Sequence, residues 1–138
     1  MDLYSVDKSE IYKTMTSSGT TGQAVSKIYL DRITASNQQK TLVKIVSSFT
    51  GSSRMPMLII DSPSTVMDRK IFSARISGIL GFSIFGSDRE YALDDNMQLN
   101  IEAVDAFLLR HKGKRVLLFG FTFIVWQHFY RELVKLRE

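Results

Sequence analysis

Apolar and polar positions alternate with two different periods along this 138-residue chain, and each change of period predicts an element. Near the start, Ile11 to Met15 predicts a strand, and the alternation within Ala24 to Leu30, with one mixed and one apolar face, predicts a second. Met57 to Ile60 is a continuous apolar run, and Arg115 to Phe119 is mostly apolar; both predict strands that are buried on two faces. Glu90 to Leu93 predicts a further short strand.

Residues with helical spacing lie between these strands, and capping residues set their limits. The predicted helices run from Asp31 or Thr34 to about Ser48, from Asp68 through Ile79, from Asn100 to Gly113, and from about Thr122 to the end. Strand and helix alternate through the second half, which favours a mostly parallel α/β sheet with flanking helices, preceded by a β-hairpin. We expect a single domain over 1–138, with residues 1–9 disordered or a stub.

The connection between the first two strands is rich in glycine and hydroxyl side chains. Glycines allow tight turns with inward N–H groups, and the hydroxyls add donors, which together suit a phosphate. Gln23 follows the last glycine where a Walker loop has lysine, so this is a different kind of loop. A phosphate-holding hairpin loop and a plain surface turn both fit this pattern. The candidate phosphate ligands are Ser17, Ser18, Gly19, Thr20, Thr21 and Gly22.

Two further residues are candidates for the same chemistry. Lys27 lies five residues past Gly22, close enough to fold back over a bound phosphate, and an ordinary surface lysine fits its position equally well. Asp61 follows the buried Met57 to Ile60 run, and open α/β sheets bind ligands at the carboxyl ends of their strands. Its alternative role is to begin a turn before Ser62-Pro63.

Composition narrows the classes of function. Without cysteine there are no disulfides and no thiolate metal sites, which fits a cytoplasmic protein. The net charge is +4, but the basic residues are scattered apart from Arg110 to Arg115, so we expect no nucleic-acid partner. The longest apolar run, Val116 to Trp126, is shorter than the ~20 residues of a membrane span.

Neither the acidic pair nor the last histidine predicts a metal site. Asp94 and Asp95 are adjacent, a pattern typical of a turn, and no third ligand is placed to help them. His128 lies beside the apolar stripe of the last helix, where a core or boundary role is expected. That helix is apolar on most sides, because Trp126, Tyr130 and Val134 lie off its main stripe. We therefore expect a partner subunit or a second copy to cover the 121–137 helix.

Several stretches together resemble one enzyme family. They are Ser17 to Gly22, Ser26 to Asp31, Arg54 to Asp61, Phe72 to Arg75 and Leu118 to Phe123. In this order they resemble the acyl-protein synthetase of the bacterial bioluminescence fatty-acid reductase complex. That family looks like a branch of the adenylate-forming, acyl-CoA synthetase-like enzymes, and the resemblance covers nearly the whole chain.

The resemblance implies an ATP-dependent ligase that activates a fatty or other carboxylic acid as an acyl-adenylate and passes the acyl group to a protein thiol. It implies ATP and Mg²⁺ as cofactors, and a fold that is part of the large N-terminal domain of adenylate-forming enzymes. By position, the hydroxyls and glycines of Ser17 to Gly22 would hold the phosphates, with Lys27 adding charge.

The chain also departs from the family pattern. The aromatic-Gly-x-Thr-Glu motif is absent, since Phe123 stands where the glutamate should be, and no cysteine can accept the acyl group. Relatives are longer, so we expect a central segment that carries the phosphate loop with an incomplete active site. The alternative is a non-catalytic nucleotide-binding or partner-docking module, a truncated or degenerate relative.

Overall fold

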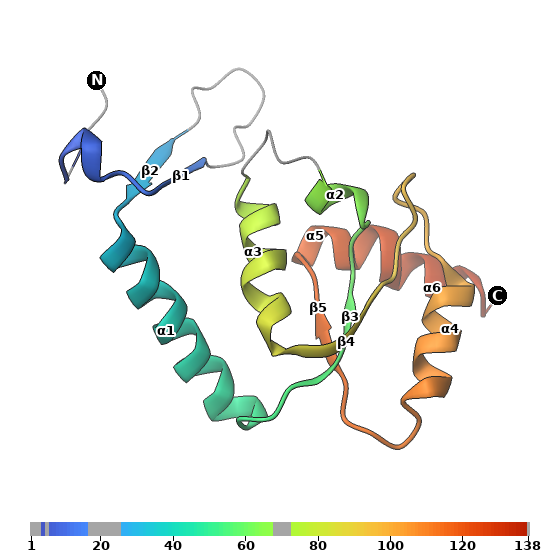
Figure 1. Ribbon diagram of the computed structural model, residues 1–138. Helices are drawn as coiled ribbons and strands as arrows, with labels where there is room; N and C mark the ends of the chain where they lie inside the picture. The colour runs from blue at the N-terminus through green and yellow to red at the C-terminus, as the bar shows by residue number, and fades with distance from the viewer. Residues whose placement is uncertain (1–3, 5, 17–25, 68–72, 138) are drawn as a thin grey trace. The chain divides into compact units, whose positions relative to one another are not determined.

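The computed structural model describes residues 4, 6–16, 26–67 and 73–137, and these residues form an α/β protein (Figure 1). Their Cα positions group them into two compact units. One unit comprises the described residues up to 53 together with 73–77, and the other comprises 54–67 and 78–137. The expectation of a single domain stays a prediction, because compact units can belong to one domain.

The first unit contains the predicted hairpin. A short 3₁₀ turn, η1 (Lys8–Glu10), is capped by Asp7, whose carboxylate accepts a 3.1 Å hydrogen bond from the Ser9 N–H. Strands β1 (Lys13–Thr16) and β2 (Lys27–Leu30) then pair antiparallel. This pairing confirms the prediction of two strands on either side of the glycine-rich connection.

Helix α1 (Arg32–Thr50) follows β2 directly and has the predicted capping residues. The Asp31 carboxylate accepts from the Thr34 N–H at 2.6 Å, so Asp31 rather than Thr34 is the N-cap. At the other end Gly51 has φ 85°, a backbone conformation that residues with a Cβ rarely adopt. Local chemistry alone therefore fixes both ends of this helix.

The second unit is built on a parallel sheet of three strands, β3 (Met55–Ile59), β4 (Gly86–Tyr91) and β5 (Leu117–Phe119). Their order is β4-β3-β5, so β3 is central. Helices α2 (Ser64–Met67) and α3 (Ala74–Phe82) and the 3₁₀ turn η2 (Ser83–Phe85) connect β3 to β4, and α4 (Ile101–Arg110) connects β4 to β5. The predicted parallel α/β sheet is confirmed.

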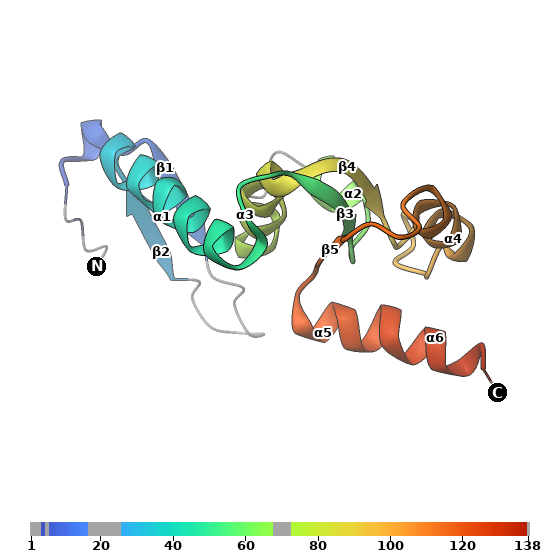
Figure 2. The same cartoon turned by 90° about the horizontal axis from the view of Figure 1, so that it is seen from below.

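After β5 the chain forms one continuous terminal helix from three segments: α5 (Thr122–Ile124), the π-helix η3 (Val125–Tyr130) and α6 (Arg131–Lys135). It runs along one side of the sheet (Figure 2). None of the described helices combines the length and the hydropathy that a bilayer span requires.

Side chains of β3 fill the core on both faces of the sheet, because successive residues of a strand point in opposite directions. Leu58 and Ile60 contact α4 and the terminal helix through Val104, Phe107 and Phe129. On the other face, the partners of β3 come chiefly from α3 and β5. They are gathered around Met57 and Ile59, and they include Ile79, Phe82, Leu117 and Phe119. Each fully buried apolar side chain contributes roughly 1.5–3 kcal/mol to folding.

Two predicted details were wrong, and a third is not tested. Strand β4 begins at Gly86 rather than Glu90, because its polar residues hide the strand from a search for apolar runs. Strand β5 is shorter than Arg115 to Phe119, and Leu118 is 56% exposed because β5 is an outer strand of the three. The predicted cap Asp68 lies outside the described residues; at the start of α3, the Ser73 Oγ accepts from the Ile76 N–H at 3.3 Å.

Candidate functional site

The predicted phosphate ligands lie outside the described residues, but the structure places the residues on either side of them. They are Ser17, Ser18, Gly19, Thr20, Thr21 and Gly22. Thr16 and Lys27 are directly opposite each other at the end of the β1–β2 ladder where the predicted loop begins. Lys27 therefore starts the strand that leaves this loop.

Lys27 presents its ammonium group to solvent. It lies on the same face of the hairpin as Thr14 and Tyr29, and Tyr29 is covered by the ring of Tyr4, with the two ring centroids 4.6 Å apart. The other face carries Leu30, which is buried. An exposed ammonium at the end of a hairpin is a donor suited to an anion. This position fits the predicted phosphate contact and is also open to any other anion.

In the second unit, the strand order defines where a ligand site is expected. The chain passes from β3 to its neighbour β4, then crosses back through α4 to pair β5 with the opposite edge of β3. Open α/β sheets bind ligands outside the carboxyl ends of the strands at such a reversal of order. The carboxyl ends of β3 and β5 meet here, since the Ile60 N–H donates to the Phe119 carbonyl at 2.7 Å.

Asp61 lies just past the carboxyl end of β3, as predicted, and is 1% exposed. One carboxylate oxygen, Oδ1, accepts from the Ser62 N–H and from the Thr65 hydroxyl, each at 2.7 Å. The Asp61 carbonyl also accepts from the Leu93 N–H at 3.1 Å, which ties the end of β3 to the segment after β4. These bonds confirm that Asp61 organises the turn before Ser62-Pro63. A ligand role for it stays a prediction.

The same turn holds a small hydroxyl cluster that the sequence analysis missed. Ser62 is fully buried, and its Oγ is 2.7 Å from the Ser64 Oγ and 3.4 Å from Oδ1 of Asp95. The available signal was the run of hydroxyl residues that follows the buried strand directly, Ser62 to Thr65. Hydroxyls at the end of a central parallel strand can donate to an anionic or carbonyl oxygen.

Tyr91, the last residue of β4, interacts electrostatically with the Asp61 carboxylate. Burial raises the pKa of its phenol above the usual value of 10.0, and the Asp61 carboxylate raises it further, while Arg89 opposes the change. The phenol therefore keeps its proton and is able to donate a hydrogen bond. The candidate site at the carboxyl ends of the strands therefore comprises Asp61, Ser62, Thr65, Tyr91 and Asp95.

The acidic pair after β4 forms the turn that its sequence predicted. Oδ1 of Asp94 accepts from the N–H groups of Asn96 and Gln98, each at 2.9 Å. Across the residues that the structure describes, no three His, Cys, Asp or Glu side chains are grouped as a metal site would need. Residues for Mg²⁺ are therefore not assigned within the described part of the chain.

The fold and these residues place the chain among parallel α/β proteins, a class in which ligands bind at the carboxyl ends of the strands. The family model of the acyl-protein synthetase LuxE matches residues 1–136. The chain thus belongs to the LuxE acyl-protein synthetase family, as its resemblance predicted. Searches of curated proteins and of solved structures gave no significant match.

Proposed function

We propose that this chain takes part in the ATP-dependent activation of a fatty or other carboxylic acid as an acyl-adenylate, which then passes its acyl group to a protein thiol. Membership of the acyl-protein synthetase family supports the overall activity. The part proposed for this chain is to bind the phosphates of ATP through Ser17, Ser18, Gly19, Thr20, Thr21 and Gly22, with Lys27 beside them.

The chemistry of adenylation explains why such a loop is needed. A carboxylate oxygen attacks the α-phosphorus of ATP, a new P–O bond forms, and the bond to the bridging oxygen of the β-phosphate breaks to release pyrophosphate. Negative charge builds up on the leaving pyrophosphate, and fixed N–H groups, hydroxyls and an ammonium stabilise it. Mg²⁺, when bound, would neutralise part of the same charge.

One observation carries the proposal beyond family membership: Lys27 is paired with Thr16 at the loop end of the hairpin and is exposed there. The hairpin holds the lysine at the point where the chain leaves the loop. A lysine at the other end of the same ladder, Lys13, is paired with Leu30 and lies on the opposite face. Lys13 is therefore a matched control for Lys27 within the same hairpin.

Isothermal titration of the full chain with ATP and Mg²⁺ tests the proposal. Because a hydrogen bond to a charged group contributes about 1.5–3 kcal/mol, we expect Lys27→Ala to weaken binding by roughly 10- to 150-fold. Lys13→Ala makes the same change at the far end of the ladder, about 10 Å away at 3.4 Å per residue, and should leave the Kd within about twofold.

Equal affinities for the two variants, or no heat with the unsubstituted chain, would contradict the phosphate-binding role. Adding Thr20→Ala and Thr21→Ala to Lys27→Ala should abolish the remaining heat if the loop hydroxyls contribute. The acceptor thiol of the proposed reaction lies outside these 138 residues, because the sequence has no cysteine.

A second candidate function, docking of another copy of the chain, is favoured by the outer face of the terminal helix. Phe123, Trp126 and Tyr130 are 68%, 58% and 51% exposed, and the Trp126 and Tyr130 rings stack with centroids 5.0 Å apart. Val134 extends this row by one turn. Exposed aromatic rows of this kind mark interaction sites. This candidate is compatible with nucleotide binding by the hairpin loop.

A further inference from the structure

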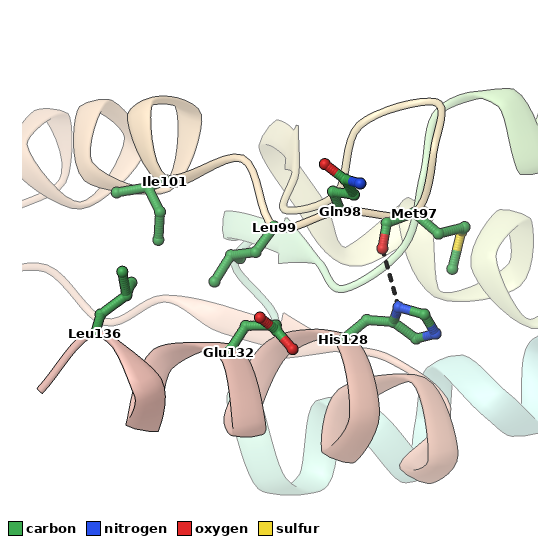
Figure 3. A pocket seen from close by; sticks show the side chains of 7 residues that line it. All are labelled: Met97, Gln98, Leu99, Ile101, His128, Glu132 and Leu136. Carbon is green, nitrogen blue, oxygen red and sulfur yellow. Dashed lines mark hydrogen bonds between the residues drawn. The ribbon is translucent and has the colours of Figure 1, made fainter. Parts of the chain in front are cut away.

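A groove of about 460 Å³ separates the segment after β4 from the terminal helix (Figure 3). We call it the edge groove. Its lining residues are Met97, Gln98, Leu99, Ile101, His128, Glu132 and Leu136. His128, Glu132 and Leu136 recur every four residues along one side of the terminal helix, so the groove is bounded by this helix on one side and by the segment from Met97 to Ile101 on the other.

Two uncommon backbone conformations face each other across the edge groove. Met97 has φ 61°, a left-handed conformation that costs a non-glycine residue about 1–2 kcal/mol. His128 lies within the π-helix η3, a rare form that is frequent at functional sites. The His128 Nδ1 donates to the Met97 carbonyl at 2.9 Å, and it carries the proton because a carbonyl only accepts. This bond ties the two walls together and fixes the spacing between them.

Leu99, in the wall opposite the terminal helix, has an open backbone edge. Leu93 and Leu99 are opposite each other in an antiparallel bridge, between the Asp94 N–H bond to Gln98 O and the Asn100 N–H bond to Ala92 O, each 2.9 Å long. Residues in this position direct their own N–H and C=O groups away from each other. Leu93 accordingly donates to Asp61 O on the β3 side. Within the described residues, the Leu99 N–H and C=O have no hydrogen-bond partner.

The lining of the edge groove carries one negative charge, although the whole chain has a net charge of +4. Its lining residues include one carboxylate, Glu132, and no lysine or arginine. In the sequence, Asp94, Asp95 and Glu102 flank the lining residues of one wall, and Arg131, Lys135 and Arg137 flank those of the terminal helix. Lys135 pairs with Glu132 at 2.7 Å, but both side chains are exposed, so a ligand cation can replace it at little cost.

We propose that the edge groove binds an extended peptide segment of a partner protein, in which apolar and basic residues alternate. The peptide adds as a strand to Leu99, whose N–H and C=O give main-chain hydrogen bonds. Its apolar side chains pack on Leu99, Ile101 and Leu136, and a lysine or arginine faces Glu132. The open edge selects an extended backbone, and the Glu132 carboxylate selects a basic side chain.

Amide NMR of the full chain, titrated with a ten-residue peptide of alternating valine and lysine, tests this proposal. We expect a saturable shift of the Leu99 amide and slower hydrogen exchange at that position. Glu132→Gln should weaken binding by about fivefold, the upper end for an exposed ion pair. Asp105→Asn removes the same charge from the exposed side of α4, outside the groove, and should change the Kd by less than twofold.

Two altered peptides make the test independent of any effect of substitution on folding. A peptide methylated at every amide nitrogen has no backbone N–H left on either edge to donate to the Leu99 carbonyl and should lose binding. A peptide with glutamate in place of lysine should bind at least fivefold more weakly. Equal binding of either altered peptide, or a bound peptide that leaves the Leu99 amide unchanged, would overturn the proposal.

Discussion

The carboxylate of Asp88 accepts hydrogen bonds from two adjacent side chains at the end of α4. His111 Nε2 lies 2.7 Å and Arg110 Nε 2.9 Å from Oδ2 of Asp88, and Arg110 also lies 3.6 Å from Glu90. His111 is buried and packs against the ring of Phe107. These contacts fasten the carboxyl end of α4 to β4 through the carboxylates of Asp88 and Glu90.

This arrangement predicts a defined pH dependence. The hydrogen bond from His111, followed by that from Arg110, lowers the pKa of Asp88 below its usual value of 3.8. Because the pKa is lower in the folded state, the contact stabilises the fold fully above pH 3.8, and this stabilisation is lost as the pH falls through the folded-state pKa. In an Arg110→Gln/His111→Phe variant, NMR titration should show the pKa of Asp88 rising toward 3.8.

Asp7 is an internal control for the same titration. Hydrogen bonds from Ser9 lower the pKa of Asp7, and the double substitution does not touch that contact. Its titration curve should therefore be unchanged. A pKa of Asp88 that stays where it is in the unsubstituted chain would show that Arg110 and His111 are not the cause.

At the scale of single residues, the sequence indicated candidate site residues, but it did not indicate which distant residues they bond to. Asp61 was predicted at the carboxyl end of a buried strand because the apolar run before it ends there. Its bonds to Ser62 and Thr65 follow from the local turn, whereas its link to Leu93 depends on how β3 and β4 pair. Contacts between distant segments leave no local signal.

Among the elements, the turn after β5 shows how one glycine allows close packing. A Cβ at Gly120 would lie 2.6 Å from Val125 Cγ2 and 2.8 Å from Ile60 Cβ. The chain thus passes against the end of β3 as it enters the terminal helix, and any side chain at this point would push the two apart.

Gly120→Ala should therefore destabilise the fold by about 1–3 kcal/mol, the range for overpacking a tight site. Chemical denaturation measures this change in the free energy of unfolding. Gly113→Asn is the matched control: a Cβ there meets nothing within 4 Å, and asparagine tolerates its φ of 78°. Equal stability of the Gly120→Ala chain and the unsubstituted chain would contradict the close packing.

A helix or strand boundary was predictable when the residues that determine it are close together in the sequence. Asn100 was predicted correctly as a cap, and Asp31 was one of the two caps predicted for α1, because each accepts from an N–H three residues along the chain. The start of β4 was misplaced because Ser87 to Glu90 are polar, and pairing with β3 makes them a strand. The π-helix η3 has no sequence signal that we recognise.

Across the whole molecule, the alternation of strands and helices predicted a parallel sheet but not the order of its strands. The order β4-β3-β5 depends on which edge of β3 each new strand joins, and both edges present the same backbone N–H and C=O groups, which carry no sequence signal. The uncovered row on the terminal helix was predictable, since Trp126 and Tyr130 lie off the buried stripe, and the structure confirms that both are exposed.

This row predicts self-association. The unsubstituted chain should show an apparent mass in light scattering that rises with concentration above the 15.7 kDa of one copy. A Trp126→Ser/Tyr130→Ser variant should stay at that mass, because it removes the stacked pair from the exposed face. Leu109→Ser, at a residue of α4 that is 73% exposed, is the control and should associate as the unsubstituted chain does. A constant mass for the unsubstituted chain would rule the association out.

The position of β5 has a consequence for synthesis of the protein. Met57 of β3 pairs with Leu117 of β5, 60 positions later. One edge of the central strand therefore stays unpaired until β5 has been synthesised. A nascent chain that has left the ribosome only as far as Gly113 carries β3 with bare N–H and C=O groups along that side. During this interval the growing chain is open to mispairing with its neighbours, and a chaperone would act on it then.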